Sequence, residues 1–342
     1  MMKKITNLLL FALCSGHLAF CQDFTFSQFY EQPLLRNPAL AGLFNGDLRI
    51  SMAYRDQWGS ITVPFRTSSL SIEHKIPIGD SHDILTIGSQ MSMDAAGDIR
   101  LKRTQFLPVV NFHKSLNDER DTYLSLAFMG GPVSSQFDVS QLKLGDQFVG
   151  GSYSANNATA QPITNNSYSY WDLTTGLSFS TVFTNKTRFY IAAGLAHFTK
   201  PPIKSLTTTT DASFLAPKLT FNIGTHSIVG EKGHMIAFAD YFSQNGNHQL
   251  LGGVLLGLDL NHYDNEETSS FYLGSFLRWG DALIPVIKLD FNHMSIGISY
   301  DINVSKLNVV SNWRGGLELT ASYHGFLKIR NSTLDRVRCV RF

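Results

Sequence analysis

Apolar and polar residues alternate one by one along most of this chain, and this period of two constrains the fold more than any other feature. Successive side chains of a β-strand point to opposite sides, so the alternation is typical of strands with one apolar and one polar face. It recurs in the segments 85–91, 296–303 and 317–324, and we find no helical period between them. The clearest example alternates Leu48, Ile50, Met52 and Tyr54 with Arg49, Ser51, Ala53 and Arg55.

Counting such segments from residue 47 to residue 328 gives about fourteen, most of them near the roughly 10 residues with which a tilted strand crosses a bilayer. Beyond the N-terminus, no run reaches the roughly 18 apolar residues of a spanning helix. The sequence therefore predicts an all-β fold, a transmembrane antiparallel β-barrel over residues 47–328. An even number of strands places both termini on one side, and we expect that side to be periplasmic.

The lengths of the connections follow the pattern of outer-membrane barrels, in which periplasmic turns are short and outer loops are long. Read from a periplasmic N-terminus, the inner links include the short segments 184–186, 230–232 and 264–266. The outer links include 132–167 and 199–213, the two longest in the chain.

A soluble sandwich of two sheets is the competing fold, because it is also built from short alternating strands. Composition argues against it, since charged residues make up 16% of the chain, against about 25% in soluble globular proteins. In a barrel the polar faces line a lumen, where scattered charges can pair or meet water. The charges that we assign to the lumen include Arg49, Arg55, Glu73 and Glu318.

Aromatic residues near the ends of the strands fit the girdle that anchors a barrel at the membrane interface. The members of this predicted girdle are Tyr54, Trp58, Tyr190, Tyr263, Trp279 and Trp313.

The N-terminus has the features of a secretory signal. Lys3 and Lys4 precede an apolar stretch at 8–20, which is followed by a cleavage site with small outer residues. We expect residues 1–21 to be the signal peptide and the mature chain to begin at Gln22.

A retained anchor and a lipoprotein acylated on Cys21 are the alternatives. The apolar stretch is short for a spanning helix, and Phe20 is bulky for lipoprotein processing. If cleavage follows Cys21, Cys339 alone survives of the 3 cysteines, which excludes an intramolecular disulfide.

Searches for catalytic motifs find no G-x-S-x-G elbow, no H-E-x-x-H pair, no phosphate-binding loop and no C-x-x-C pair. The 11 histidines are scattered, without the short spacing of metal ligands. We therefore predict a non-enzymatic protein without metal or cofactor, and the net charge of +1 argues against a nucleic-acid partner. An outer-membrane hydrolase that joins a serine to His197 or His74 across strands is a further, unsupported alternative.

Two regions, one near each end, are more specific than a barrel requires. The first contains Phe26-Ser27-Gln28-Phe29-Tyr30, Pro33-Leu34, Asn37-Pro38-Ala39-Leu40-Ala41-Gly42 and Tyr54-Arg55-Asp56-Gln57-Trp58. The second contains Ser299-Tyr300-Asp301-Ile302-Asn303-Val304-Ser305-Lys306-Leu307, Gly315-Gly316-Leu317-Glu318-Leu319 and Cys339-Val340-Arg341-Phe342. Together they resemble the PorP/SprF family of type IX secretion system membrane proteins. One departure is Val340, which stands where the family pattern usually has proline.

The resemblance implies an outer-membrane barrel that supports secretion or surface attachment of a cargo protein with a C-terminal sorting domain, often a large adhesin encoded nearby. It also implies protein partners, including periplasmic components of the secretion machine, in addition to outer-membrane lipid. The alternative function is a transport channel for small or apolar solutes, since barrels of this size also serve as channels.

The N-terminal part of the first region should lie outside the regular sheet. Pro33 and Pro38 cannot take part in a strand ladder, so we expect residues 22–46 to form an irregular periplasmic segment, folded against or into the barrel mouth. Gly42 would close its turn. At the other end, residues 329–342 are expected to form a periplasmic tail.

We select seven residues of the first region as candidates for binding a partner: Asn37, Pro38, Gly42, Tyr54, Arg55, Gln57 and Trp58. In the first strand, Tyr54 and Trp58 should direct their rings outward and Arg55 its guanidinium inward. An unpaired guanidinium in the lumen would be costly unless something accepts hydrogen bonds from it. A membrane girdle combined with lumen packing is the competing explanation for these residues.

Overall fold

The computed structural model describes residues 23–59, 63–79, 82–154, 156–157, 159–160, 166–184, 186–204, 212–260, 269–306 and 308–326. The expected signal peptide, the expected C-terminal tail with Cys339, and Tyr263 of the expected girdle lie outside these residues.

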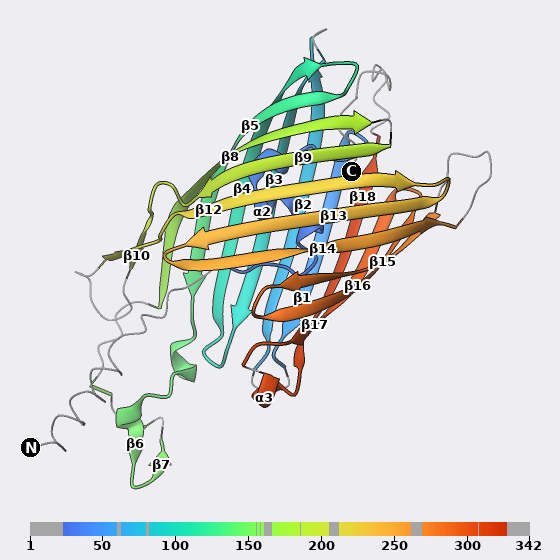
Figure 1. The fold of residues 1–342 in the computed structure, drawn as a ribbon. Coiled ribbons are helices and arrows are strands. Elements are labelled where there is room, and N and C mark those ends of the chain that lie inside the picture. Colours follow the sequence, from blue (N-terminus) through green and yellow to red (C-terminus); the bar gives the residue numbers. More distant parts are fainter. Residues whose placement is uncertain are drawn as a thin grey trace, which may run out of the picture.

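Within the described residues, fourteen antiparallel strands form one closed barrel, as the sequence predicted (Figure 1). The strands follow one another around the wall in chain order, and β18 closes the barrel by pairing with β1, with Leu48 opposite Gly325. The barrel strands are β1 (Leu48–Gln57), β2 (Phe65–Ile78), β3 (Asp83–Ala96), β4 (Leu101–Asn117), β5 (Thr122–Gln136), β8 (Ser167–Thr184), β9 (Thr187–Ala196), β12 (Lys218–Val229), β13 (Gly233–Gln244), β14 (Asn247–Asp259), β15 (Ser269–Arg278), β16 (Ala282–Phe291), β17 (Met294–Asn303) and β18 (Arg314–Gly325).

The two ends of the barrel differ. β1 begins and β18 ends at the same end, which we call the terminal rim. The opposite end, the loop rim, carries the long connections 137–166 and 197–217, whereas β8 and β9 are joined at the terminal rim by a short turn. Two predicted short links, 184–186 and 230–232, therefore lie at the end opposite the two longest links, as expected. The third, 264–266, lies outside the described residues.

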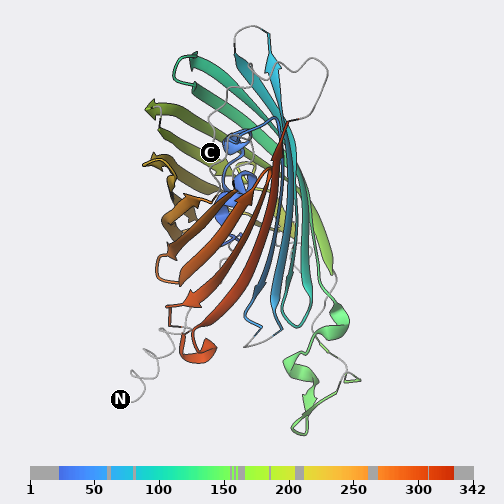
Figure 2. The same ribbon diagram turned by 90° about the vertical axis from the view of Figure 1, so that its right-hand side faces the viewer.

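The loop-rim connections contain secondary structure of their own. The longer one holds the 3-10 turns η3 (Val139–Gln141) and η4 (Gly145–Gln147) and a hairpin of β6 (Phe148–Val149) and β7 (Ser152–Tyr153), which projects beyond the barrel (Figures 1 and 2). The other holds the pair β10 (Pro202–Lys204) and β11 (Ala212–Phe214). The short helix α3 (Asn308–Ser311) joins β17 to β18. No helix of the described residues is long and apolar enough to span a membrane.

Several strands are longer than the sequence led us to expect, with 17 residues in β4 and 18 in β8. These neighbouring hairpins exceed the roughly 10 residues that cross a bilayer at a tilt. Pairing between antiparallel strands needs no lipid, so the hairpins can extend past the membrane surface.

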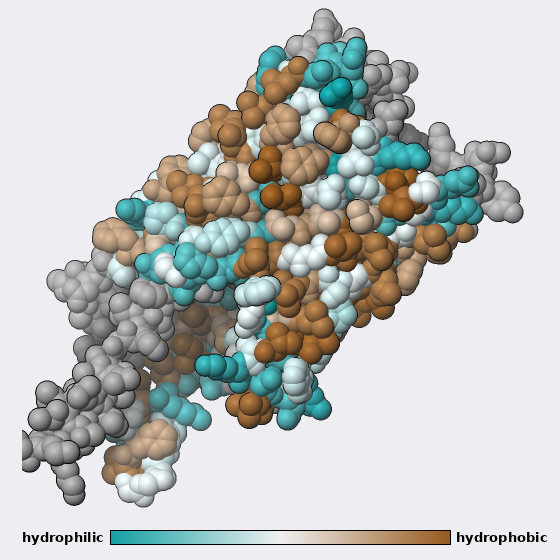
Figure 3. Space-filling view, viewed as in Figure 1, coloured by the Kyte–Doolittle hydropathy of each residue, from teal (hydrophilic) through white to brown (hydrophobic). Residues whose placement is uncertain are grey.

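The alternating apolar and polar residues of the sequence lie on the outer and inner faces of the barrel wall. On β1, Met52 is 55% exposed and Tyr54 is 41% exposed, whereas Arg49 and Arg55 are buried. Apolar side chains cover the strands on the face shown in Figure 3. The predicted lumen charges Arg49, Arg55, Glu73 and Glu318 are all buried inside.

Tyr190 corrects the expected girdle. Its side chain points into the lumen, is 3% exposed and accepts a hydrogen bond from Arg36. Its neighbours Phe189 and Ile191 occupy the opposite face of β9, because side chains alternate along a strand.

The barrel interior is filled by the chain's own N-terminal residues, seen in blue between the walls in Figure 2. Residues 23–47, which we call the lumen segment, contain η1 (Phe29–Glu31), α2 (Pro33–Arg36) and η2 (Pro38–Leu40). The sequence placed this segment in the periplasm, against or within the barrel mouth. In the structure the segment lies inside the lumen, and its periplasmic position stays a prediction.

The apolar core lies between the lumen segment and the inner wall. Phe29 packs against one cluster on β14–β16, Leu34 and Ala41 against a second on β4 and β5, and Leu40 and Leu43 against a third that includes Tyr190. Each cluster needs side chains from the segment, so the segment and the wall form one packed unit.

Candidate functional site

The lumen segment spans the interior from one rim to the other. Its first described residue, Asp23, contacts Arg103 and Lys218, which lie at the loop-rim ends of β4 and β12. Its last residue, Asp47, donates its backbone N–H to the carbonyl of Gly325 at the terminal rim, at 3.0 Å. The contacts that hold this segment form the candidate site.

Two prolines set the local conformation of the segment. Pro33 begins α2 and Pro38 begins η2, positions where a fixed φ suits a helix and a missing N–H costs no hydrogen bond. Between them, the Asn37 side chain accepts from the N–H of Ala39 at 2.9 Å and donates to Asn222 on the wall at 3.2 Å. Both prolines therefore lie outside the strand ladder, as predicted.

Gly42 lies where the segment touches the wall most closely. Its φ is +83°, and a Cβ there would come within 2.3 Å of Thr86 Oγ1 and 2.7 Å of His113 Nε2. Its N–H donates to Glu73 at 2.9 Å. Any side chain at this position would push the segment off β3 and β4.

At the terminal rim the segment is held by Phe44. Its ring lies 4.7 Å from the guanidinium of Arg49 and 4.5 Å from Lys75 Nζ, while its carbonyl accepts from Lys75 at 2.7 Å. Arg49 in turn makes two hydrogen bonds of 2.8 Å with Glu73. Buried cations are thus compensated both by an aromatic ring and by a carboxylate.

In the middle of the lumen, Arg36 joins the segment to β13 and β9. It donates two hydrogen bonds, of 2.6 and 2.7 Å, to Asp240 and a third, of 2.7 Å, to the hydroxyl of Tyr190. Its guanidinium also lies over the rings of Phe29 and Phe238, at 4.9 and 5.4 Å. This bidentate pair is fully enclosed, since Asp240 is not exposed at all.

The sequence motifs from the two ends of the chain meet at one place in the lumen. Glu318 accepts from the backbone N–H groups of Ser27 and Gln28 at 2.7 and 2.6 Å, and Asp301 accepts from the Ser27 hydroxyl at 2.5 Å. Arg55 donates to Asp301 at 2.8 Å and to the carbonyl of Thr25. The acceptor that Arg55 requires is therefore present.

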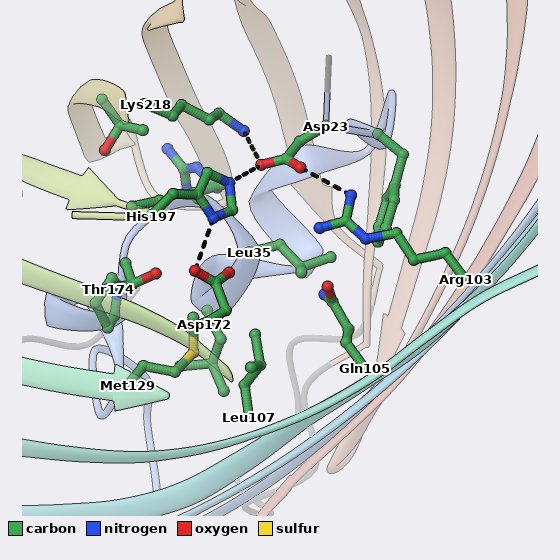
Figure 4. Close-up of a pocket in the computed structure, with 16 residues that line it drawn as sticks. Asp23, Leu35, Arg103, Gln105, Leu107, Met129, Asp172, Thr174, His197 and Lys218 are labelled. Atoms are coloured by element: carbon green, nitrogen blue, oxygen red, sulfur yellow. Dashed lines mark hydrogen bonds and ion pairs between the residues drawn. The ribbon is translucent and has the colours of Figure 1, made fainter. Parts of the chain in front are cut away.

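Near the loop rim, three cations converge on Asp23 (Figure 4). Its carboxylate lies 3.0 Å from Arg103 Nη1, 2.7 Å from His197 Nε2 and 3.6 Å from Lys218 Nζ. His197 Nδ1 lies 2.8 Å from Asp172. The five side chains come from the segment, β4, β8, β12 and the residue after β9.

Asp23 and His197 stabilise each other's charged forms. Burial acts to raise the pKa of Asp23, but His197, Lys218 and Arg103 hold that pKa well below its usual range. Burial acts to lower the pKa of His197, but Asp23 and Asp172 raise it to about 9. At neutral pH both groups are therefore ionised.

We expect the loop-rim end of the lumen segment to loosen as the pH rises through about 9. The pKa of His197 is about 9 in the folded protein, against about 6.5 in an unfolded chain. Its contribution to stability is therefore complete below about pH 6.5 and is lost as the pH rises through about 9. The pKa of Asp23 is lowered, so the contribution of Asp23 to stability is lost only at acid pH.

Hydrogen exchange of residues 23–28 between pH 7 and pH 10, corrected for the intrinsic exchange rate, measures this loosening. A His197→Gln variant should be loose already at pH 7 and show no further step. A wild-type profile that stays flat through pH 9 would contradict the assignment.

A small cavity of about 50 Å³ lies beside Asp23 between the segment and the wall. Its lining includes Leu35, Gln105, Leu107, Met129, Thr174 and Thr220. Two buried polar atoms of its lining residues, Thr220 Oγ1 and Arg103 Nε, have no hydrogen-bond partner. A polar group that entered the cavity could satisfy them.

The site does not have the arrangement of a catalytic triad. Both ring nitrogens of His197 are hydrogen-bonded to carboxylates, so neither is free to take a proton from a hydroxyl. The Nδ1 atom of His74 contacts the backbone carbonyl of Asp47 at 3.1 Å. Across the described ranges, no group of three or more histidine, cysteine, aspartate or glutamate residues is arranged to hold a metal ion.

The structure divides the seven candidate residues into two sets. Asn37, Pro38, Gly42 and Arg55 lie in the lumen, where each contacts its own chain. The other three lie elsewhere: Tyr54 faces outward, Gln57 ends β1, and Trp58 packs edge-on against Phe65 at 5.0 Å.

Sequence reasoning missed Asp23, Arg103, Asp172 and Lys218. No local motif contains them, because the separations along the chain are long. Alternation does assign Arg103, Asp172 and Lys218 to the polar faces of their strands, each near the loop-rim end. The inward-facing positions of each strand, combined with the direction in which the strand runs, would have placed these three side chains at the same rim of the lumen. Nothing in the sequence indicated Asp23.

Several solved channel structures are distantly similar to this chain. The Pseudomonas putida toluene transporter TodX is 10% identical, with 85% of this chain and 92% of that chain covered and a TM-score of 0.44. The CymD monoaromatic hydrocarbon channel is 10% identical, with coverage of 87% and 94% and a TM-score of 0.43. A Pseudomonas aeruginosa FadL homologue is 10% identical, with coverage of 84% and 92% and a TM-score of 0.40. Likenesses this distant carry no argument about function.

No curated protein matches the chain significantly. The sequence profile of the type IX secretion system membrane protein PorP/SprF, in contrast, matches residues 19–323, which is nearly the whole chain. The match includes the lumen segment and thirteen complete barrel strands, and it reaches into β18, where Glu318 binds the segment. The chain therefore belongs to the PorP/SprF family and is a type IX secretion β-barrel of the bacterial outer membrane.

Proposed function

We propose that this barrel docks an exported protein with a C-terminal sorting domain, such as an adhesin, and links it to the periplasmic components of the type IX machine. The observation that supports docking over solute transport is the lumen segment, which packs against the inner wall from rim to rim. A channel that passes solutes along the barrel axis needs an open lumen. We also propose that the protein acts without catalysis, since its best-placed histidine is engaged by two carboxylates.

The terminal rim is the periplasmic end in this proposal. Outer-membrane barrels place short turns in the periplasm and long loops outside. The loop rim carries the connections 137–166 and 197–217, so it would face the cell exterior. The lumen segment would then run from the outer rim inward.

The loop rim offers exposed apolar side chains that a cargo protein could cover. Phe148 is 55% exposed and Val149 is 63% exposed on the β6–β7 hairpin, and Val309 and Val310 are exposed on α3. Trp279 lies on the β15–β16 turn at the same rim. Exposed apolar patches rimmed by polar residues are typical of binding surfaces.

The seven residues selected from the sequence fit this proposal in different ways. Asn37, Pro38, Gly42 and Arg55 would support docking indirectly, by holding the lumen segment in place. Gln57 and Trp58, at the loop-rim end of β1, lie where a partner can reach them, and Tyr54 would contact lipid.

Deletion of the gene tests the docking role. We expect at least one sorting-domain protein to disappear from the cell surface and the medium, because its dock in the outer membrane is lost. Mass spectrometry of surface and secreted proteins measures this, with the periplasmic fraction as a check for retained cargo. Complementation with the intact gene should restore secretion.

A second strain narrows the docking surface. Replacing residues 147–154, which include the β6–β7 hairpin, by a glycine-serine linker should leave an inserted barrel that no longer displays the cargo. Unchanged secretion and attachment of every sorting-domain protein in the deletion strain would refute the proposal. Normal display of the cargo in the linker strain would show that the docking surface lies elsewhere on the loop rim.

A further inference from the structure

We propose that Arg103, His197 and Lys218 form a receptor for a carboxylate, that Asp23 occupies it in the closed barrel, and that an acidic peptide segment of a partner can take the place of Asp23. The inference deepens the proposed function by stating the chemistry of the partner, and only the identification of that partner as cargo depends on docking.

The arrangement of charges at this place supports a receptor. Three cationic side chains, from β4, the end of β9 and β12, surround one carboxylate oxygen pair (Figure 4). Without Asp23, the three cationic side chains would have only one carboxylate in the cluster, that of Asp172. The cluster would then carry an excess of positive charge. Excess buried charge favours binding of another carboxylate.

The wall holds the receptor in place independently of the segment. Arg103 donates to the hydroxyl of Tyr170 at 3.1 Å, and His197 is fixed by Asp172 at 2.8 Å. Lys218 Nζ lies 4.9 Å from the ring of Phe242. Because these contacts do not involve Asp23, the cations should stay in position when Asp23 leaves.

Asp23 belongs to the more exposed, loop-rim end of the segment. Asp23, Phe24 and Thr25 are partly exposed, and the Thr25 hydroxyl makes a long hydrogen bond of 3.4 Å to Gln249. From Phe26 onward most of the segment is buried, and Glu318 binds its backbone at Ser27 and Gln28. The segment can therefore open from its loop-rim end without losing the deeper contacts.

The neighbouring cavity is small, with about 50 Å³ directly beside Asp23, so an incoming carboxylate would occupy the place that Asp23 leaves. The Thr220 hydroxyl is buried there without a hydrogen-bond partner, as is Arg103 Nε. A peptide with a carboxylate and backbone polar groups could satisfy the receptor and these two atoms together.

Binding of two synthetic peptides to the purified full chain in detergent micelles tests the proposal. One peptide is a short glycine-rich sequence with two aspartates, and the other has asparagines in their place. We expect the Asp23→Asn variant to bind the acidic peptide at least about tenfold more tightly than the wild type does, which corresponds to about 1.4 kcal/mol. Neither protein should bind the asparagine peptide.

Three variants act as controls. Asp23→Glu keeps the internal carboxylate and should bind like the wild type. Asp146→Asn makes the same chemical change in the long loop, where Asp146 accepts from Thr159 and Ala160, and should also bind like the wild type. Asp23→Asn combined with Arg103→Met should lose the gain in affinity.

Hydrogen exchange of the wild type provides a test that needs no substitution. A saturating amount of the acidic peptide should speed exchange in residues 23–26 and leave residues 27–28 and 36–44 unchanged. Equal binding of the two peptides, or no gain from Asp23→Asn in a correctly folded barrel together with unchanged exchange in the wild type, would overturn the receptor. These outcomes are independent of the secretion assay, so failure of the receptor and failure of cargo docking can be distinguished.

Discussion

Removal of residues 26–44 should convert a silent barrel into an open pore. The deleted residues include all three short helices of the lumen segment and its apolar contacts with the wall. The wall itself is closed by the β1–β18 pairing and does not need the segment for its ladder. Lumen charges such as Asp240 and Glu318 would then be hydrated, as in water-filled barrels.

Conductance in planar bilayers measures the opening. The wild type should give almost no current, whereas the deletion variant should give discrete open steps. A barrel with the β6–β7 hairpin replaced is the matched control, because that change leaves the lumen filled. If the deletion variant folds by circular dichroism yet stays silent, or if the wild type already conducts like a porin, the closed-lumen interpretation is wrong. Should the deletion not fold, substituting Phe29→Ala and Phe44→Ala together gives a milder opening to measure.

Arg36→Ala should cost about 3–5 kcal/mol of the free energy of unfolding, the range for breaking a buried ion pair by removing one partner. The substitution leaves the carboxylate of Asp240 enclosed without its two hydrogen bonds from Arg36, and it also removes the guanidinium that lies over Phe29. Denaturant unfolding in detergent or lipid, followed by tryptophan fluorescence, measures the loss.

The exposed pair of Arg66 and Asp56 provides a matched control for this buried pair. It joins the same residue types at 3.1 Å, but its side chains are 60% and 31% exposed. Arg66→Ala should therefore cost at most about 1 kcal/mol. If the two arginine substitutions destabilise equally, water reaches Asp240 and the middle of the lumen is not sealed.

The barrel could be predicted because its signal is local. Alternation along a single strand already separates the outward Met52 and Tyr54 from the inward Arg49 and Arg55, whatever the rest of the chain does. Strand number and the grouping of short and long connections follow from the same pattern. Tyr190 was assigned to the girdle because it lies near a strand end, and this assignment was wrong. Tyr190 lies two residues from the inward-facing Ala192, so alternation along the strand would have placed it in the lumen.

The site could not be predicted to the same extent. Motif resemblance selected Asn37, Gly42 and Arg55, and it covered Ser27 and Glu318, but it did not indicate that the last two touch. Their separation of 291 residues leaves no periodic trace in the sequence. Only the folding of the lumen segment into the closed barrel brings Ser27 to Glu318 on the last strand.

The amino-acid sequence by itself determined the strands, the sidedness of their faces and the family, since each depends on neighbouring residues or on a recognisable run. The tertiary structure decided that the N-terminal residues fill the lumen and that Asp23 meets Arg103, His197 and Lys218. The physical reason is that a closed wall of polar side chains must satisfy its buried charges. The partners that do so were selected by their position in space, which the order of residues along the chain does not reveal.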